Sequence, residues 1–239
     1  VDMGNTRLKW ALCDDIDLIS QPPIANSQIN AQTLVNLWQT MQIPKHLAMS
    51  CVSSSQFVNL VICVAKELWP SIIIIQEKPT ASGFGITNAY QEPEKLGVDR
   101  WLGMLAAYHK YQKALCIVGC GTAITVDVLD ATGKHLGGLI SPGLRLMKEA
   151  LANNTAHLCL NQTAHTIGLA NHTDAGIYNG TLSAACGLIE YTLIKQTENL
   201  EIILTGGDAE VIARQLTKPA IIEPNLVLHG LALILQKAV

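Results

Sequence analysis

Short apolar runs alternate along the chain with segments in which apolar residues recur every three or four positions. The apolar runs, which predict strands, cover residues 47–53, 71–76, 114–130, 200–207 and 220–224. The helical periodicity covers residues 31–42, 54–68, 99–112, 143–152, 181–197 and 208–216. Strands that alternate with helices are typical of α/β proteins, so we expect this fold class.

Two stretches of the chain look like the beginnings of separate domains. VDMGNTRLKWALCDD (1–15) and CIVGCGTAITVDVLDATGKHLGG (116–138) each predict a strand, a turn with glycine and threonine, and a returning strand. We therefore expect two domains, 1–112 and 113–239, with a ligand between them. Because only Val1 precedes the first turn, we also expect the first strand to be cut short, with apolar residues upstream.

Composition narrows the range of partners. The chain has 239 residues, of which 49% are hydrophobic and 15% charged, and its formal net charge is -3. A protein that binds a nucleic-acid backbone needs clustered Lys and Arg, and no such cluster occurs. The longest apolar runs are far below the roughly 20 residues that span a bilayer, and no signal peptide is visible. We therefore expect neither a nucleic acid nor a membrane as partner.

Cysteine usage indicates the cellular compartment. The seven cysteines are scattered, odd in number, and form no CxxC pair. This pattern predicts free thiols and a cytoplasmic protein. The seven histidines show no HxxxH spacing, so we do not expect a zinc site.

The stretch DMGNTRLK (2–9) combines residues that suit a phosphate site. Gly4 permits a turn and a close approach of the backbone, while the N–H groups and the Thr6 hydroxyl can surround phosphate oxygens. Asp2 offers a ligand to Mg2+, and Lys9 adds positive charge. An ordinary hairpin turn is the alternative, because turns favour the same residues.

A second stretch, GCGTAITVD (119–127), repeats this chemistry. Gly121 loosens the backbone, Thr122 and Thr125 carry hydroxyls, and Asp127 ends the returning strand. A plain hairpin would again look similar. Two such turns could hold a nucleotide triphosphate from both sides, although neither a Walker nor a Rossmann motif occurs.

Two further stretches have both a functional and a structural interpretation. In LTGGDAE (204–210), Gly206 and Gly207 could let a flat ring approach the backbone, but a strand-to-helix turn needs glycine anyway. In YQEPEKLGVDRW (90–101), Asp99 stands before a helical pattern, as an N-cap would. Arg100 suits a two-pronged grip on a carboxylate, and an exposed arginine is the alternative.

Five motifs together carry a resemblance to a known family. They are DMGNT, YQEPEKLGVDR (90–100), GTAITVD (121–127), GGLISPG (137–143) and LTGGD (204–208). In this order and spacing they resemble type III pantothenate kinase, a family of the acetate and sugar kinase, heat-shock ATPase and actin superfamily. The resemblance runs along almost the whole chain. It implies an α/β fold of two ribonuclease H-like domains of the actin-like ATPase superfamily with an interdomain cleft.

The resemblance also implies an activity: transfer of the γ-phosphoryl group of ATP to pantothenate, at the start of coenzyme A biosynthesis. Asp99 would accept the hydroxyl proton, Gly97, Val98 and Arg100 would line the pantothenate site, and Tyr90 would close one wall. The implied nucleotide-binding residues are Asp2, Met3, Gly4, Asn5, Thr6, Arg7, Leu8, Lys9, Gly121, Thr122, Gly206 and Gly207. The implied Mg2+ ligands are Asp2 and Asp127.

Three further expectations follow from the resemblance. Thr173, in NHTDAGIYNG (171–180), would enter the site of a partner subunit in an obligate homodimer. Helix 182–197 would then form either the seam of this dimer or a buried helix within one subunit. Many family members have an acidic residue where this chain has Gly119, so we expect weaker dependence on K+ or NH4+.

Two other functions compete with the kinase. One is another small-molecule kinase of the same superfamily, which would act on a sugar or acetate. The other is a non-catalytic nucleotide-binding regulatory module, in which Asp99 would be dispensable.

Overall fold

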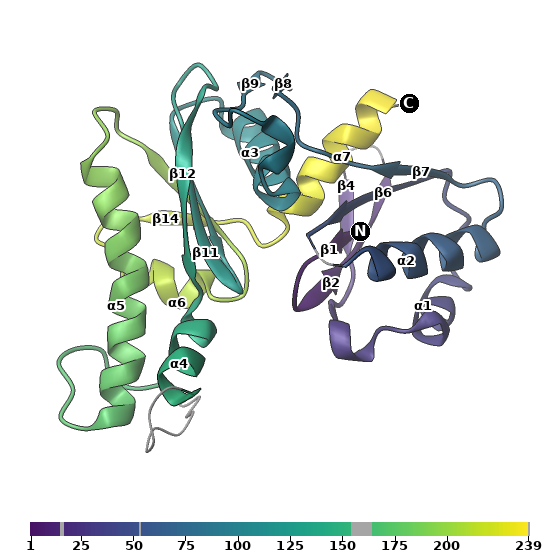
Figure 1. The fold of residues 1–239 in the computed structure, drawn as a ribbon. Helices are drawn as coiled ribbons and strands as arrows, with labels where there is room; N and C mark the ends of the chain where they lie inside the picture. The colour runs from purple at the N-terminus through teal and green to yellow at the C-terminus, as the bar shows by residue number, and fades with distance from the viewer. Residues whose placement is uncertain (15–16, 53, 154–163, 239) are drawn as a thin grey trace. The chain divides into compact units, whose positions relative to one another are not determined.

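The computed structural model describes residues 1–14, 17–52, 54–153 and 164–238 of the chain (Figure 1). The chain divides into two compact units: unit 1 comprises residues 1–110 and 225–239, and unit 2 comprises residues 111–224. Each unit contains its own five-stranded sheet and helices.

The sheet of unit 1 has the strand order β5-β2-β1-β6-β7. Its strands are β1 (Asp2–Met3), β2 (Arg7–Lys9), β5 (Ile24–Ala25), β6 (His46–Cys51) and β7 (Ile73–Gln76). Strand β1 runs antiparallel to β2 and parallel to β6, so the short hairpin at the N-terminus is inserted into the middle of the sheet. Two small hairpins complete unit 1: β3 (Ala11–Asp14) with β4 (Asp17–Ser20), and β8 (Ser82–Gly83) with β9 (Ile86–Thr87).

Four α-helices and a cluster of indole rings complete the core of unit 1. The helices are α1 (Ala31–Trp38), α2 (Ser55–Leu68), α3 (Val98–Tyr111) and α7 (Leu226–Ala238). The rings of Trp38 and Trp69 stack with their centroids 5.6 Å apart, and Trp10 meets Trp38 edge-on. Helix α7 approaches the backbone of α3 closely, because a Cβ atom at Gly230 would overlap the carbonyl group of Leu102.

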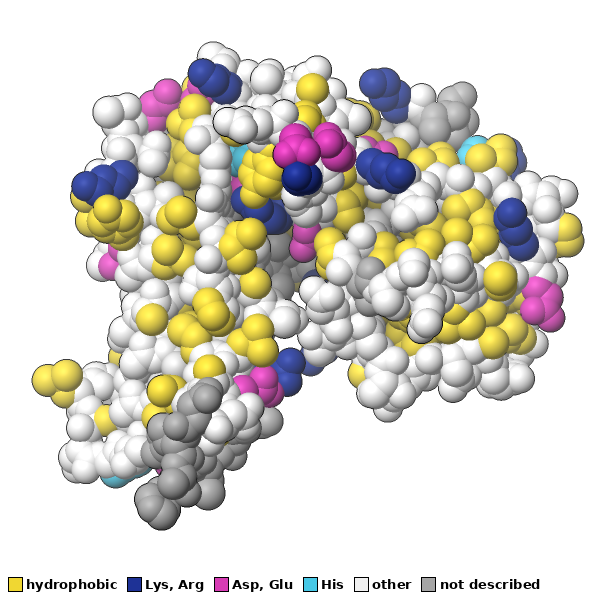
Figure 2. Space-filling model, viewed as in Figure 1, with side chains coloured by type: hydrophobic (Ala, Val, Ile, Leu, Met, Phe, Trp, Pro, Cys, Tyr) yellow, Lys and Arg dark blue, Asp and Glu magenta, His cyan; other side chains and the backbone are white. Residues whose placement is uncertain are grey.

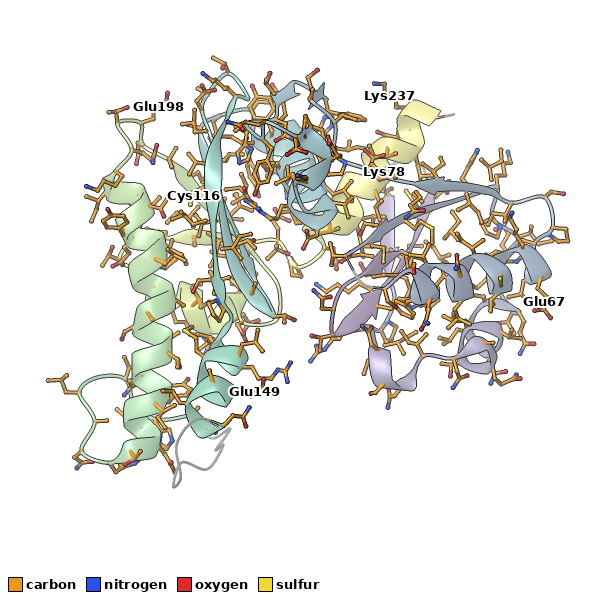
Figure 3. All side chains as sticks on the ribbon, in the orientation of Figure 1. Glu67, Lys78, Cys116, Glu149, Glu198 and Lys237 are labelled. Carbon is orange, nitrogen blue, oxygen red and sulfur yellow. The ribbon has the colours of Figure 1, made fainter. Side chains whose placement is uncertain are left out.

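The sheet of unit 2 has the order β12-β11-β10-β13-β14. Its strands are β10 (Leu115–Cys120), β11 (Ala123–Leu129), β12 (His135–Pro142), β13 (Glu201–Thr205) and β14 (Ala220–Ile222). The helices α4 (Leu144–Asn153), α5 (Thr173–Ile194) and α6 (Ala209–Ala213) pack against these strands (Figure 1). Cys116 of β10, labelled in Figure 3, is fully buried in this core.

The expected α/β class is confirmed, and most predicted elements occur within a few residues of their expected ends. Helix α7 was not predicted, because LVLHGLALILQKA is apolar on nearly every side and shows no clear helical period. Because of this helix, the observed units differ from the expected domains 1–112 and 113–239. Residues 225–239 belong to unit 1, although they follow unit 2 in the sequence.

On the face drawn in Figure 2, the Lys and Arg side chains of the described residues are scattered among uncharged ones, without a broad basic patch. None of the helices within the described ranges is long and apolar enough to cross a membrane.

Candidate active site

Three polar side chains form a row across the sheet of unit 1. Asp2 of β1 lies opposite Lys9 of β2 and opposite Ser50 of β6. Residues that lie directly opposite each other in neighbouring strands present their side chains on the same face of the sheet. The Ser50 hydroxyl donates a hydrogen bond to Asp2 Oδ1 over 2.6 Å. The sheet therefore holds a carboxylate between a hydroxyl and a cation.

The environment of Asp2 pulls its pKa in both directions. Burial of the carboxyl group is the largest effect and raises the pKa, and the negative charge of Asp99 raises it further. The hydrogen bond from Ser50 and the positive charge of Lys9 oppose this increase. The net pKa lies above the usual value, because burial disfavours the charged form more than the opposing contacts favour it. The same interaction identifies Asp99 as an electrostatic neighbour of Asp2 within unit 1.

The turn after β1 is held by backbone bonds and by one asparagine. The Gly4 N–H donates to the Arg7 carbonyl over 3.1 Å, which closes the turn. Asn26 donates its side-chain amide to the Gly4 carbonyl at 2.9 Å and its backbone N–H to the Thr6 carbonyl at 3.0 Å. Asn5, Thr6 and Arg7 are exposed. These contacts fix a turn whose outer groups face solvent.

Two residues of the same motif do not face a ligand. The side chains of Met3 and Leu8 are fully buried in the core of unit 1. They belong to the opposite face of the sheet from Asp2 and Lys9, because side chains alternate along a strand. The expectation that Met3 and Leu8 bind nucleotide is therefore corrected: their side chains stabilise the hairpin by packing in the core of unit 1.

Asp99 lies inside the first turn of α3 rather than at its N-cap position. The helix begins at Val98, and the Trp101 N–H donates to the Gly97 carbonyl over 3.0 Å, so Gly97 occupies the cap position. Asp99 Oδ1 accepts a hydrogen bond from the Arg100 N–H at 2.9 Å. The alternative interpretation of Asp99 as an N-cap is thus wrong, but its carboxylate does lie at the positive end of the helix.

Gly97 leaves the space that the Asp99 carboxylate occupies. A Cβ atom at position 97 would lie 2.6 Å from Asp99 Oδ1, closer than real Cβ contacts come. Any side chain at this position would displace the carboxylate. The glycine of the LGVDR sequence therefore positions Asp99 sterically.

Arg100 and Tyr90 form a pair beside Asp99. The Arg100 guanidinium donates to the Tyr90 hydroxyl over 2.7 Å and lies 5.5 Å from the centroid of the Tyr90 ring. Arg100 is only 8% exposed, so this arginine is not the freely solvated residue that was the alternative interpretation. Val98 is buried, and its side chain faces the core. The pair places a buried positive charge close to the first turn of α3.

In unit 2, two glycines pack against the turn between β10 and β11. Cβ atoms at Gly143 and Gly206 would overlap the backbone carbonyl groups of Gly121 and Cys120, respectively. Gly206 also has a φ of +105°, a conformation that glycine adopts far more readily than other residues. The loop after β13 and the start of α4 thus both reach the Gly121–Thr122 turn, where Gly121 is exposed and Gly207 has open space around its Cα.

Asp127 does not share the environment of the other predicted site residues. Its carboxylate is 2% exposed within β11, and Oδ1 lies 3.0 Å from Nε2 of the buried His135 on β12. A carboxylate that is buried and shared with an imidazole is poorly placed to bind a solvated cation that arrives with phosphates. The expectation that Asp127 binds Mg2+ is therefore corrected. Of the two predicted Mg2+ ligands, Asp2 remains the candidate.

Two other predicted positions lie in unit 2. A Cβ atom at Gly119 would lie 2.6 Å from Thr125 Oγ1, so the threonine hydroxyl occupies the space that an acidic side chain at position 119 would need.

Thr173 is exposed at the first residue of α5. One face of α5 is buried in unit 2, whereas a Cβ atom at Gly176, Gly180 or Gly187 would meet no other atom within 4 Å.

A large groove in unit 1 contains none of the predicted site residues. It has a volume of about 870 Å³ and is lined by Trp10, Trp38 and Trp69, with apolar residues of β3, β6 and α7. Within the described ranges, no three His, Cys, Asp or Glu side chains gather as a ready-made metal site. The predicted site residues of unit 1, Asp2 and Asp99 among them, therefore lie outside the lining of this groove.

Three residues that hydrogen-bond to predicted site residues carry no recognisable signal in the sequence. Ser50 stands in LAMSCVSSS, where serines indicate a strand end or a helix cap rather than a partner for a distant aspartate. Asn26 lies in a loop, and His135 precedes a glycine pair. No local pattern identifies them, because each acts on a residue of another strand or turn.

Comparison with known proteins gives one family and one fold. A sequence model of the family "Type III pantothenate kinase" matches residues 1–195. A type III pantothenate kinase from Nitrosococcus oceani is 36% identical over 247 aligned residues, which cover 97% of this chain and 91% of the relative.

Two solved structures share the fold. One is a putative Baf family transcriptional activator from Campylobacter jejuni, with a TM-score of 0.62, 20% identity, and coverage of 99% and 96% of the two chains. The other is a putative 2-dehydro-3-deoxygalactonokinase from Sinorhizobium meliloti, with a TM-score of 0.59, 12% identity, and coverage of 99% and 97%. The chain therefore shares its fold with these proteins, and the expected α/β fold with a sheet in each of two parts is confirmed.

The buried Asp127–His135 pair predicts a loss of stability when it is broken. We expect Asp127→Ala to lower the free energy of unfolding by about 2 kcal/mol, because the buried imidazole would lose its partner. Urea unfolding measures the change. In a double-mutant cycle with His135→Ala, the two losses should sum to more than the loss in the double variant. An Asp127→Ala protein as stable as the parent would show that the pair contributes nothing.

Proposed function

Since this chain belongs to the type III pantothenate kinase family, we propose that it transfers the γ-phosphoryl group of ATP to the terminal hydroxyl of pantothenate. The product, 4'-phosphopantothenate, enters coenzyme A biosynthesis. The observation that carries the proposal is that Asp2 and Asp99 lie near enough in unit 1 for the negative charge of Asp99 to raise the pKa of Asp2. Phosphoryl transfer needs one carboxylate toward a cation and another toward the acceptor hydroxyl, and these two residues supply both.

Asp2 suits Mg2+ by the chemistry of its donors. Mg2+ prefers oxygen ligands, keeps several waters and binds through one or two carboxylates together with substrate phosphates. Oδ1 of Asp2 accepts the Ser50 hydrogen bond, so the second carboxylate oxygen is the atom that would bind the cation. When bound, Mg2+ neutralises charge on the phosphates. Lys9, next to Asp2 in the row, adds positive charge on the same face of the sheet.

Asp99 is the proposed acceptor of the pantothenate hydroxyl proton. The Arg100 N–H and the N-terminal end of α3 stabilise the ionised form of the Asp99 carboxyl group. A stabilised carboxylate is a weak base, but phosphoryl transfer has a loose transition state that needs little early deprotonation. Asp99 therefore contributes mainly by aligning the hydroxyl and by receiving its proton late in the reaction. Gly97 supports this role, since it leaves room for the carboxylate.

Arg100 and Tyr90 are proposed to bind the carboxylate of pantothenate. A guanidinium has five N–H donors, and the hydrogen bond from Arg100 to the Tyr90 hydroxyl over 2.7 Å orients its plane. A buried arginine is a strong site for a carboxylate, because the surrounding protein screens their attraction less than water does. The Tyr90 ring, held against the guanidinium, would form one wall of the pocket.

The glycine turns are proposed to hold the nucleotide. In unit 1, the exposed residues Asn5 and Thr6 offer backbone N–H groups and a hydroxyl that suit phosphate oxygens, while the Gly4 N–H closes the turn. In unit 2, the Gly121–Thr122 turn suits phosphates, and the open space at Gly207 suits a flat ring. Neither Met3 nor Leu8 contributes a side chain to this proposal.

A homodimer is proposed from the open face of α5. The helix packs one side into unit 2, and its other side carries three glycines together with the exposed Tyr191. Small residues allow the backbone of a second helix to approach closely. Thr173, exposed at the start of the same helix, would then reach the pantothenate site of the partner subunit.

The proposed compartment is the cytoplasm. The six cysteines within the described residues form no disulfide bond, and those of β10 are deeply buried. Burial raises the pKa of the Cys116 and Cys120 thiols to about 12, which keeps them protonated and unreactive. Free thiols are typical of proteins from a reducing compartment.

We predict that Asp99→Asn lowers kcat roughly 10²-fold or more, the usual scale for loss of a general base. The amide keeps nearly the same shape but cannot accept the proton. An ADP-release assay with and without pantothenate measures turnover. Asp17→Asn, an exposed aspartate of β4, is the matched control and should turn over like the parent. Unchanged turnover of Asp99→Asn would instead favour the regulatory-module hypothesis or another proton acceptor.

The monovalent-cation prediction follows from Gly119 and Thr125. Because the carboxylate is missing and a hydroxyl fills its space, we expect only weak dependence on K+ or NH4+. Turnover in K+, NH4+ and Na+ at equal ionic strength measures this dependence. Complete loss of activity when Na+ replaces K+ would contradict the prediction.

The dimer prediction uses complementation between two impaired variants. If Thr173 acts across the interface, mixing Asp99→Asn with Thr173→Ala creates heterodimers in which one site has both Asp99 and Thr173. We expect the mixture to regain turnover with the KM for pantothenate of the parent. Each variant alone should remain impaired. If the mixture shows only the average of the two separate proteins, Thr173 does not act in a partner's site.

A further inference from the structure

Ser50 is a polar residue in the part of β6 whose other buried positions are apolar. It is fully buried, and its neighbour Met49 is fully buried on the opposite face of the sheet. A hydroxyl buried without a partner costs roughly 1–3 kcal/mol, so an apolar residue would serve the core better. The hydrogen bond to Asp2 at 2.6 Å offsets this cost.

The position of Ser50 fixes which oxygen of Asp2 is engaged. Parallel pairing of β1 with β6 places Ser50 directly opposite Asp2, and the Ser50 N–H donates to the Val1 carbonyl over 3.0 Å. The two backbones are therefore held together next to the side-chain bond. Because the donor comes from a central strand, Asp2 Oδ1 has a fixed partner and the carboxylate plane has a fixed direction.

We propose that Ser50 is a positioning residue for cation binding: it holds Oδ1 of Asp2 so that the second carboxylate oxygen is presented to Mg2+. Ser50 does not itself touch the cation. A partner that orients a metal-binding carboxylate in this way acts on the affinity for the metal. This inference rests on the proposed function of Asp2, and no motif in the sequence points to it.

The test is a Mg2+ titration of thermal stability in the presence of a non-hydrolysable ATP analogue. We expect Ser50→Ala to need about tenfold more Mg2+ than the parent for half of the Mg2+-dependent shift in Tm. In the ADP-release assay the same variant should show a similar increase in the Mg2+ concentration for half-maximal rate. Its KM for pantothenate should equal that of the parent.

Two further variants separate positioning from a general loss of stability. Thr192→Val removes a buried hydroxyl of α5 that donates to the Leu188 carbonyl over 2.8 Å. It should lower Tm without changing the Mg2+ titration. Ser50→Cys nearly keeps the volume of the side chain but replaces the hydroxyl by a weak donor. It should therefore need the same higher Mg2+ concentration as Ser50→Ala, and it serves as the test if Ser50→Ala folds poorly.

The outcomes distinguish this inference from the proposed function. If Ser50→Ala and Ser50→Cys titrate with Mg2+ like the parent, the positioning role is overturned. In an Asp2→Asn background, Ser50→Ala should cause no additional change, and a further tenfold change would also overturn it. Failure of the parent to release ADP with pantothenate would instead refute the proposed reaction, while the thermal titration with nucleotide would still test Ser50.

Discussion

The row of Lys9, Asp2 and Ser50 is the constraint on which the candidate site of unit 1 depends. Asp2 is a partly buried carboxylate near the negative charge of Asp99, and both effects disfavour its ionised form. A hydrogen bond on one side and a lysine on the other oppose them. This balance requires three strands in one register, because a shift by one residue would turn Asp2 toward the core. The chemistry of Asp2 is thus tied to the pairing of the sheet.

The same sheet explains why one short motif serves two purposes. In DMGNTRLK, alternate side chains point to opposite faces of the hairpin. Met3 and Leu8 enter the core, and Asp2 and Lys9 face the other side. Removing the buried side chains would affect folding, whereas changing the polar ones would affect charge at the site. A motif that is continuous in sequence is therefore divided between stability and function.

Glycine has a similar double role in both units. Gly97 in unit 1 leaves space for the Asp99 carboxylate, and Gly206 in unit 2 lets a loop pack against the carbonyl of Cys120. In each case the absence of a side chain sets the position of a neighbouring group. Helical glycines on α5 differ, because their surroundings are open. The same residue type thus marks a tight contact in one place and an accessible face in another.

The sequence by itself determined the alternation of strands and helices, the two glycine-containing hairpins, and the family to which the chain belongs. These features are local, since turn chemistry and periodicity are written in consecutive residues. The tertiary structure decided which residues share a site. It paired Ser50 with Asp2 and His135 with Asp127, placed Asp99 inside the helix, and returned α7 to unit 1. These outcomes depend on strand register and on packing between distant segments, which no local pattern encodes.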